Sequence, residues 1–163
     1  MNRVAQAFDE IAAELDAAVR RIVWCTVCTV DRRGRPRGRI LHPYWEGPTG
    51  WILTNRDSHK AKHLAANPWV TCSYWDPQHE RVHADCRAEW VDAVAEKRRV
   101  WELFRSAPAP YGYDPIAFWP KGFDDPGTGL LKLVPWRIEL WGVPEGGVSP
   151  GNPFRVTVWR PDA

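Results

Sequence analysis

A basic stretch lies where the sequence predicts that a strand ends and a helix begins. It reads Thr54-Asn55-Arg56-Asp57-Ser58-His59-Lys60-Ala61-Lys62-His63-Leu64. Cations in the first turn of a helix oppose the helix dipole, so Arg56, Lys60 and Lys62 cost stability unless an anion joins them. A bound phosphate would make these cations stabilising, because first-turn N–H groups, the Ser58 hydroxyl and the Lys60 ammonium can all bind it. The alternative is a solvated basic helix that binds nothing.

A second basic cluster precedes the first along the chain. Arg35, Arg37 and Arg39 lead into Ile40-Leu41-His42, and strand alternation places Arg37 and Arg39 on one face. Arginine binds phosphate through paired hydrogen bonds, although these residues fit the polar face of an amphipathic strand equally well. Two basic clusters beside strand edges in a nearly neutral chain favour one shared anionic ligand. We therefore expect a phosphorylated cofactor.

The composition predicts an ordinary globular protein. Hydrophobic residues make up 44% of the 163-residue chain and charged residues 26%, a balance typical of chains with a packed core. The net charge of +2 argues against a general nucleic-acid or membrane-surface binder. No apolar run is long enough to cross a membrane, and the acidic, amphipathic N-terminus is unlike a signal peptide. We expect a cytoplasmic protein that binds neither nucleic acid nor membranes.

Hydrophobic periodicity predicts many short strands with a few helices between them. We expect helices over 5–21, 58–66 and 93–105, and strands over 22–30, 37–45, 51–54, 69–75, 81–91, 130–141 and 154–160. Hairpin-linked strands indicate an antiparallel, closed or partly closed barrel rather than a doubly wound sheet. A loop over 107–128, rich in proline, glycine and aromatic residues, fits a lid or a dimer arm. No repeat or linker divides residues 1–163, so we expect one domain.

Other chemistries find little support in the sequence. Cys25 and Cys28 form a C-x-x-C pair, but they lie in a β-branched strand whose alternation points them to opposite faces, so buried free cysteines are expected. His59 and His63 are one helical turn apart, yet the neighbouring cations would repel a metal dication, so no metal site is expected. There is no Gly-x-Ser-x-Gly elbow, Walker loop or Gly-x-Gly-x-x-Gly turn.

The stretch from Thr54 to Ala61 resembles the T-N-x-x-S-x-K-A motif of the pyridoxamine 5′-phosphate oxidase-like, FMN-binding split-barrel family, and Arg39-Ile40-Leu41 resembles that family's R-x-x-L strand. The order of elements is similar over nearly the whole chain, and Asp57-Ser58 with the later Asn67-Pro68 is similar to the general-stress-protein branch. The resemblance implies a mainly β, α+β fold: a Greek-key antiparallel split β-barrel that binds FMN.

The resemblance also implies roles for particular residues. Arg39, Ser58 and Lys60 would hold the FMN phosphate, and backbone groups from Ile40 to His42 would face the flavin ring. The residues expected at the cofactor are Arg37, Arg39, Ile40, Leu41, His42, Thr54, Ser58, His59, Lys60 and Trp141.

Trp141 is among these residues because it ends the strand Pro135-Trp136-Arg137-Ile138-Glu139-Leu140-Trp141. This strand is similar to a family strand that ends E-F-W. In that family the final tryptophan reaches the flavin of the partner subunit, which implies a homodimer. Alternation places Trp136, Ile138 and Leu140 on one face and Trp141 on the other, with Arg137 and Glu139. A rim contact in a dimer is the other interpretation of Trp141.

Two departures separate this chain from the true oxidases of the family. Glu80-Arg81-Val82-His83 lacks the glutamine expected after the E-R pair, and Phe154 to Arg160 replaces a C-terminal R-L-H-D-R substrate signature. These departures argue against recognition of the vitamin substrate. We expect an FMN-binding oxidoreductase that transfers electrons through flavin bound at a homodimer interface. The alternatives are a deazaflavin-dependent reductase, a non-catalytic flavin-binding stress or storage protein, and, less attractively in a nearly neutral chain, an oligonucleotide-binding barrel.

Overall fold

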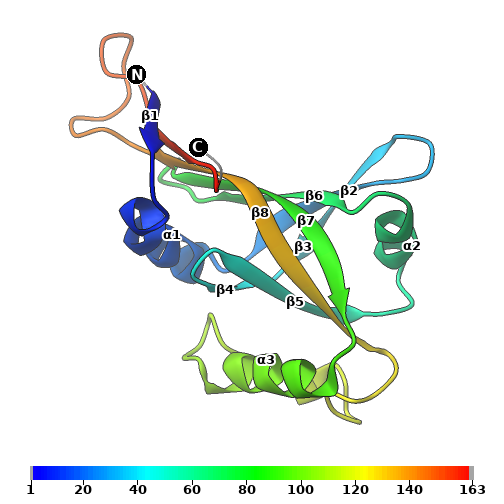
Figure 1. Cartoon of the computed structure of the whole chain (residues 1–163). Helices are drawn as coiled ribbons and strands as arrows, with labels where there is room; N and C mark the ends of the chain where they lie inside the picture. Colours follow the sequence, from blue (N-terminus) through cyan, green and yellow to red (C-terminus); the bar gives the residue numbers. More distant parts are fainter. Residues whose placement is uncertain (1, 162–163) are drawn as a thin grey trace.

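The computed structural model describes residues 2–161, in which a strongly curled β-sheet is flanked by helices (Figure 1). The elements in chain order are β1 (Asn2–Ala5), α1 (Asp9–Ile22), β2 (Cys25–Val30), β3 (Pro36–Leu41), β4 (Tyr44–Glu46), β5 (Thr49–Asn55), α2 (His59–Ala66), β6 (Trp69–Trp75), β7 (Arg81–Val91), α3 (Val94–Ser106), the 3-10 turn η1 (Pro115–Ala117), β8 (Thr128–Gly142) and β9 (Arg155–Trp159). This confirms the expectation of a mainly β fold with flanking helices.

The long strand β8 joins two parts of the sheet. The strand order within residues 2–161 is β1-β9-β8-β7-β6-β2-β3, and β5 pairs with both β8 and β4. The first part of β8, from Thr128 to Leu133, pairs with β5, whereas its last part, from Ile138 to Gly142, pairs with β9. All these pairings are antiparallel except that of β1 with β9. The sheet therefore curls around a core and opens between β3 and β5.

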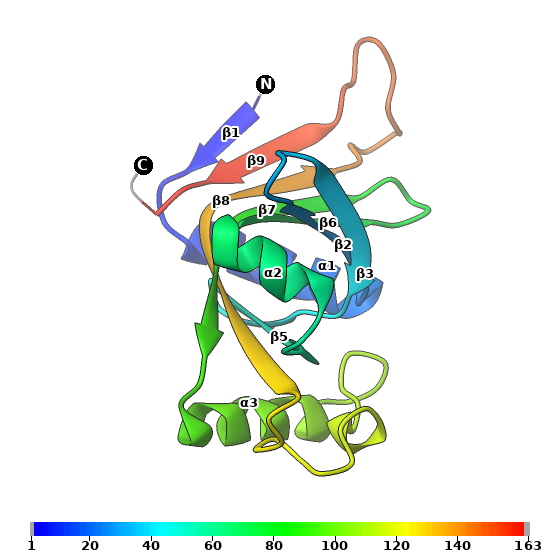
Figure 2. The same cartoon turned by 90° about the vertical axis from the view of Figure 1, so that its right-hand side faces the viewer.

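Two helices cover different parts of this curled sheet. α1 has apolar residues at helical spacing, and it buries Ile11, Leu15 and Val19 where it packs on β6, β7 and β8. α2 packs against β2 and lies across the opening between β3 and β5 (Figure 2). Its N-terminus therefore points to the place where the sheet is incomplete.

The structure corrects the predicted strand over 37–45, which is two strands. β3 ends at Leu41 and β4 begins at Tyr44, with His42 and Pro43 between them. Proline has no N–H to donate to a ladder, so a strand commonly bends or ends beside it. This bend turns His42 inward, where it is 7% exposed.

The predicted face of Trp136 is also wrong. A register shift between Asp85 and Cys86 leaves Trp136 without a partner, so the alternation of β8 is interrupted beside Pro135. Ile138 is buried as expected, whereas the Trp136 side chain is 47% exposed on the outer face. The short parallel strand β1 was not predicted, because four residues give too little alternation to recognise.

The remaining sequence expectations concern cysteines and membranes. All four cysteines are free, and Cys25, Cys72 and Cys86 are buried while Cys28 is half-buried. Burial raises the pKa of the Cys25 thiol, so it is not poised as a nucleophile. No helix within residues 2–161 is long and apolar enough to span a membrane.

Candidate functional site

The N-terminus of α2 places two polar groups at the opening of the sheet. Ser58 is the N-cap residue, but its side chain does not cap the helix, and no acidic residue lies in the first turn. The Ser58 hydroxyl instead accepts a hydrogen bond of 3.0 Å from Nζ of Lys60. The Lys60 side chain is buried, and this burial, together with the charge of Arg39, lowers its pKa. The first-turn N–H groups thus remain without a side-chain cap.

Arg39 approaches the same place from β3. Its Nη1 donates a hydrogen bond of 2.6 Å to the hydroxyl of Thr29, which lies 2.9 Å from Nδ1 of His63. Burial lowers the pKa of Arg39, and the charge of Arg37 adds to this effect. Thr29 is buried and was not singled out in the sequence, since a lone threonine in a β-branched strand carries no distinguishing signal.

Arg39 and Lys60 form a cationic pair for which residues 2–161 provide no counterion. Within residues 2–161 neither has a carboxylate within salt-bridge distance, although 14 ion pairs occur elsewhere in that range. Burial is the largest cause that lowers the pKa of each group, and the charge of Arg39 lowers the pKa of Lys60 further. An anion bound between Arg39 and Lys60 would attract both cations and so stabilise the pair.

A cavity of about 330 Å³ opens beside this pair, between the β3–β4 corner and β5. We call it the β3–β5 cavity. The residues that line it are Trp24, Ile40, Leu41, His42, Leu53, Thr54, Asn55, Lys60, Pro110, Tyr113, Phe118 and Trp119. It is largely apolar and has a cationic end, which suits a flat organic ligand with an anionic tail.

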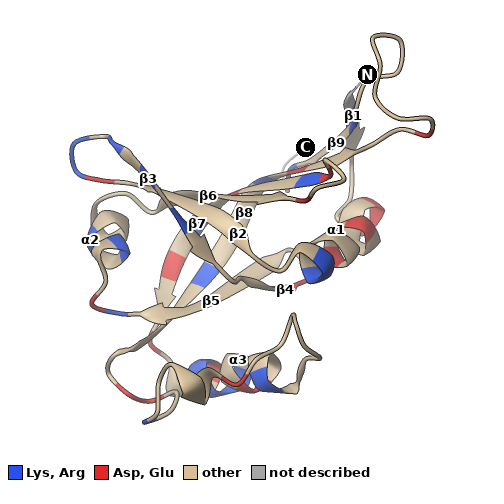
Figure 3. Ribbon diagram, turned by 180° about the vertical axis from the view of Figure 1, so that it is seen from behind, with Lys and Arg blue, Asp and Glu red and all other residues tan. Residues whose placement is uncertain are grey.

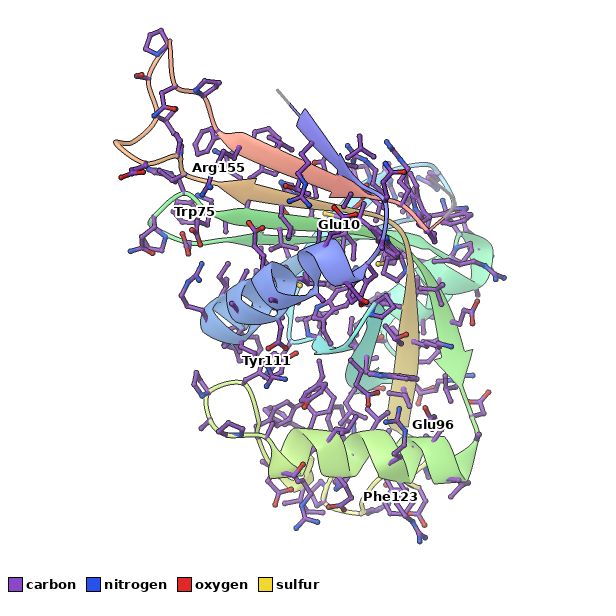
Figure 4. All side chains as sticks on the ribbon, turned by 60° about the vertical axis from the view of Figure 1, so that its left-hand side comes forward. Glu10, Trp75, Glu96, Tyr111, Phe123 and Arg155 are labelled. Carbon is purple, nitrogen blue, oxygen red and sulfur yellow. The ribbon has the colours of Figure 1, made fainter. Side chains whose placement is uncertain are left out.

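The wall opposite β5 comes from the loop after α3, within the predicted lid or arm over 107–128. Tyr111, in this loop, lies near α1 and the β4 strand (Figure 4), and its hydroxyl accepts a 2.7 Å hydrogen bond from the backbone N–H of Trp45. Tyr113, Phe118 and Trp119 extend from the same loop to the cavity. The aromatic composition of this loop indicated a lid or arm, but it did not indicate which residues of the loop reach the site.

A second hollow, a basic groove of about 940 Å³, lies between the β2–β3 turn and α2. Lys and Arg positions lie on both of these elements, the β2–β3 turn and α2 (Figure 3). The groove is lined by Asp31, Arg32, Arg33, Arg35, Arg56, Asp57, Ser58, Ala61, Lys62, His63 and Ala65. Asp31 forms an ion pair with Arg35, so this carboxylate is already neutralised. Ser58 belongs to the groove and also contacts Lys60, which lines the cavity, so the two hollows are neighbours.

The structure brings most of the predicted site residues together. Ile40, Leu41, His42, Thr54 and Lys60 line the β3–β5 cavity.

Three predicted residues lie further from the cavity. Arg37 and His59 are close in sequence to the cationic pair, but their side chains are exposed. Trp141 lies near the far end of β8, where its Nε1 donates a 3.2 Å hydrogen bond to Glu139 and its ring packs with Phe154. Within one chain Trp141 does not line the cavity. No group of three potential metal ligands is clustered among the residues that the structure describes.

The fold and site together define a barrel protein with a cationic corner beside an apolar cavity. A family model described as pyridoxamine 5′-phosphate oxidase matches residues 11–142. The chain therefore belongs to the pyridoxamine 5′-phosphate oxidase-like, FMN-binding family.

Individual relatives agree with this assignment. The chain is 31% identical over 117 residues to the pyridoxine/pyridoxamine 5′-phosphate oxidase of Aliivibrio salmonicida, covering 71% of this chain and 52% of that protein. This chain thus spans about half the length of that relative. A Clostridium acetobutylicum protein related to general stress protein 26 superposes with a TM-score of 0.72 at 15% identity, covering 94% of this chain and 96% of that one.

A pyridoxamine 5′-phosphate oxidase-related, FMN-binding protein of Nostoc punctiforme has a TM-score of 0.60 at 16% identity, covering 93% of this chain and 97% of that one. These structural matches confirm the expected fold, a split β-barrel.

Proposed function

We propose that this protein is a flavin-dependent oxidoreductase that binds FMN, with Arg39, Ser58 and Lys60 around the phosphate. The observation that carries the proposal is the pair formed by half-buried Arg39 and buried Lys60, which has no counterion among the described residues. Lys60 of this pair lines the β3–β5 cavity. A dianionic phosphate there would satisfy both cations and the uncapped N-terminus of α2. Membership of an FMN-binding family supports the same ligand.

The chain's own residues bind and orient the ligand in this proposal. FMN supplies the electron-transfer chemistry when bound, so no side chain needs to act as a nucleophile. Ile40, Leu41 and Thr54 line the cavity beside the cationic end and would hold the ring system, while Tyr113 and Trp119 would shield it from water.

A second copy of the chain belongs to the proposal. Trp141 lies too far along β8 to line the cavity of its own chain, and we propose that it reaches the flavin of a partner in a homodimer. Its indole is half-buried and fixed by Glu139 and Phe154, so it is already oriented before any partner binds.

The test is to denature the purified protein and identify any released small molecule by mass spectrometry, then to titrate the cofactor-free protein with FMN and follow flavin fluorescence. We expect one FMN per chain. A protein that releases no flavin and leaves the fluorescence of added FMN unchanged would refute the proposal. Turnover with reduced nicotinamides then separates an oxidoreductase from a non-catalytic flavin-binding stress or storage protein.

The basic groove favours a second candidate, a deazaflavin-dependent reductase or another user of a cofactor with anionic groups beyond its first phosphate. Arg32, Arg33 and Lys62 line this groove, next to Ser58, without an ion-pair partner in the described part of the chain. Replacing Arg32 and Arg33 by glutamine would leave FMN affinity unchanged and weaken only the longer, more anionic cofactor. Equal affinities for both cofactors in the parent protein would speak for FMN.

A further inference from the structure

His42 has a buried ring nitrogen that nothing in the described chain satisfies. The residue is 7% exposed, and its Nε2 has no hydrogen-bond partner among residues 2–161. Buried polar atoms in folded proteins nearly always have partners, so such an atom calls for an explanation. His42 also lines the β3–β5 cavity, so this nitrogen belongs to a residue at a ligand-sized space.

Aromatic rings surround His42 on several sides and hold it in place. Its ring centroid lies 5.1 Å from that of Trp24, 5.2 Å from that of Tyr113 and 5.8 Å from that of Phe104. Contacts of this kind fix the plane of the imidazole without using its nitrogens. The side chain is therefore a rigid hydrogen-bonding group in a mostly aromatic setting.

The two ends of the cavity differ in chemistry. Lys60 marks the cationic end, next to Ser58 and Arg39. His42 lies at the β3–β4 corner, where its ring packs against Trp24, just before β2, and against Tyr113 of the loop after α3. A ligand with a phosphate at one end and a planar heterocycle at the other matches this order.

We propose that Nε2 of His42 forms a hydrogen bond with the heteroatom-bearing edge of the flavin ring, and that His42 is thereby a positioning residue for the ring. The inference rests on the proposed function, since it concerns the same cofactor, but it uses a different group from the phosphate site. Burial lowers the pKa of His42, more than a backbone hydrogen bond with Tyr111 raises it, so the imidazole is neutral near pH 7 and carries one N–H. A neutral imidazole can meet a ring nitrogen or a carbonyl without adding a buried charge.

The proposal also predicts how His42 affects the stability of the cofactor-free protein. A buried group without a partner destabilises a fold, whereas an apolar ring of similar shape at the same place does not. His42→Phe should therefore raise the Tm of the cofactor-free protein and weaken flavin binding. A merely structural histidine would behave in the opposite way, because its removal would lower the Tm.

The experiment compares two flavins in three variants. FMN and riboflavin share the ring, but riboflavin lacks the phosphate, and both are titrated by fluorescence into cofactor-free parent, His42→Phe and Lys60→Gln proteins. We expect His42→Phe to weaken both flavins by the same factor, about 2- to 12-fold for one neutral hydrogen bond. Lys60→Gln should weaken FMN alone.

Two further measurements distinguish a ring contact from general damage. The visible absorption bands of bound FMN should shift in His42→Phe and return toward the parent position in His42→Gln, which keeps a hydrogen-bonding group. Inorganic phosphate, as a competitor of FMN, should bind the parent and His42→Phe equally. If His42→Phe fails to fold, His42→Leu serves for the same titrations.

The outcomes separate this inference from the proposed function. If FMN binds, Lys60→Gln weakens it and His42→Phe leaves both flavins at parent affinity with unshifted bands, the positioning role is wrong and the phosphate site stands. A fall in Tm with loss of phosphate binding in His42→Phe also overturns the role. If the parent binds neither flavin, the proposed function and this inference both fail.

Discussion

Arg39 and Lys60 contrast with the other basic residues of the chain. Arg21, for example, donates a 2.8 Å hydrogen bond to Asp76 and a second to Glu80, and these acceptors raise its pKa. For Arg39 and Lys60 burial and neighbouring cations act in the opposite direction and lower the pKa. Folding therefore brings this pair together at an energetic cost, which is the arrangement expected of a preformed anion site.

The first prediction concerns the phosphate end of the site. Lys60→Ala should weaken FMN binding roughly 10- to 150-fold, since a hydrogen bond to a charged group contributes about 1.5–3 kcal/mol. The Tm of the cofactor-free protein should stay the same or rise slightly, because a cation near a helix N-terminus opposes the dipole. Arg39→Ala should weaken binding similarly. Fluorescence titration measures the affinity and calorimetry the Tm.

Lys62 provides the control for that prediction. It lines the basic groove rather than the β3–β5 cavity, so Lys62→Ala should change FMN affinity by less than about threefold, as expected for a screened surface charge. Parent-like FMN affinity in Lys60→Ala, or its failure to fold, would show that Lys60 has a solvated or structural role instead.

A pH prediction follows from His42 and His63. Burial is the largest cause that lowers the pKa of each, so both bind protons less readily in the folded than in the unfolded protein. Their contribution to stability is complete above the unfolded pKa of about 6.5 and is lost as the pH falls through the lower folded values. The free energy of unfolding of the cofactor-free protein should thus decrease below about pH 6.5. Urea titrations at several pH values would show a shallower decrease in His42→Phe, and an identical pH profile would contradict the assignment.

At the scale of elements, the loop after α3 depends on one close backbone approach. A Cβ added to Gly112 would lie 2.0 Å from the carbonyl oxygen of Ala107, which no flexible side chain can relieve. The loop places Tyr111 under β4 and Tyr113 at the cavity, so its path matters for both core and site.

Gly112→Ala should therefore displace this loop. We expect a loss of stability on the order of 1–3 kcal/mol, as for other forced overpacking, together with weaker flavin binding. Gly151→Ala is the matched control, because a Cβ there meets nothing within 4 Å, and its Tm should equal that of the parent. Calorimetry on both variants checks the prediction, and an unchanged Tm in Gly112→Ala would mean that the loop can take another path.

The elements illustrate what the sequence could and could not predict. β6 and β7 have the predicted bounds, because β7 alternates polar and apolar residues from Arg81 to Trp90 and β6 does so between its two terminal tryptophans. The bend at Pro43 and the bulge beside Pro135 were not predicted. A proline indicates that a strand is interrupted, but not how the backbone bends there. Lys60 was predicted from a local motif, whereas Thr29 and Trp24 join the site only through tertiary contacts.

At the scale of the whole molecule, the outer face of the sheet has the character of an interface. An apolar hollow of about 490 Å³ lies there, flanked by Trp69 and Trp136, which are 52% and 47% exposed. Beside it a polar network is already satisfied: Asp85 accepts hydrogen bonds from Thr71 at 2.7 Å and from Arg137 at 3.2 Å. Exposed tryptophans next to satisfied polar groups are typical of surfaces that bind another protein.

We predict that this face forms the homodimer and that Trp136→Arg disrupts it. The bulge beside Pro135 turns Trp136 outward, so its indole is available to fill a partner's surface, and an arginine there would leave a charge buried in the interface. Sedimentation should show a dimer for the parent at micromolar concentration and a monomer for Trp136→Arg. The monomer should also bind FMN more weakly, because it loses the proposed contact from the partner's Trp141.

Val94→Arg is the control, since Val94 is 55% exposed at the start of α3 and does not line the hollow. That variant should remain dimeric and bind FMN like the parent. A monomeric parent that binds FMN would remove the need for a partner at the site. A dimer that survives Trp136→Arg would instead move the interface to another face and leave Trp141 without its proposed role.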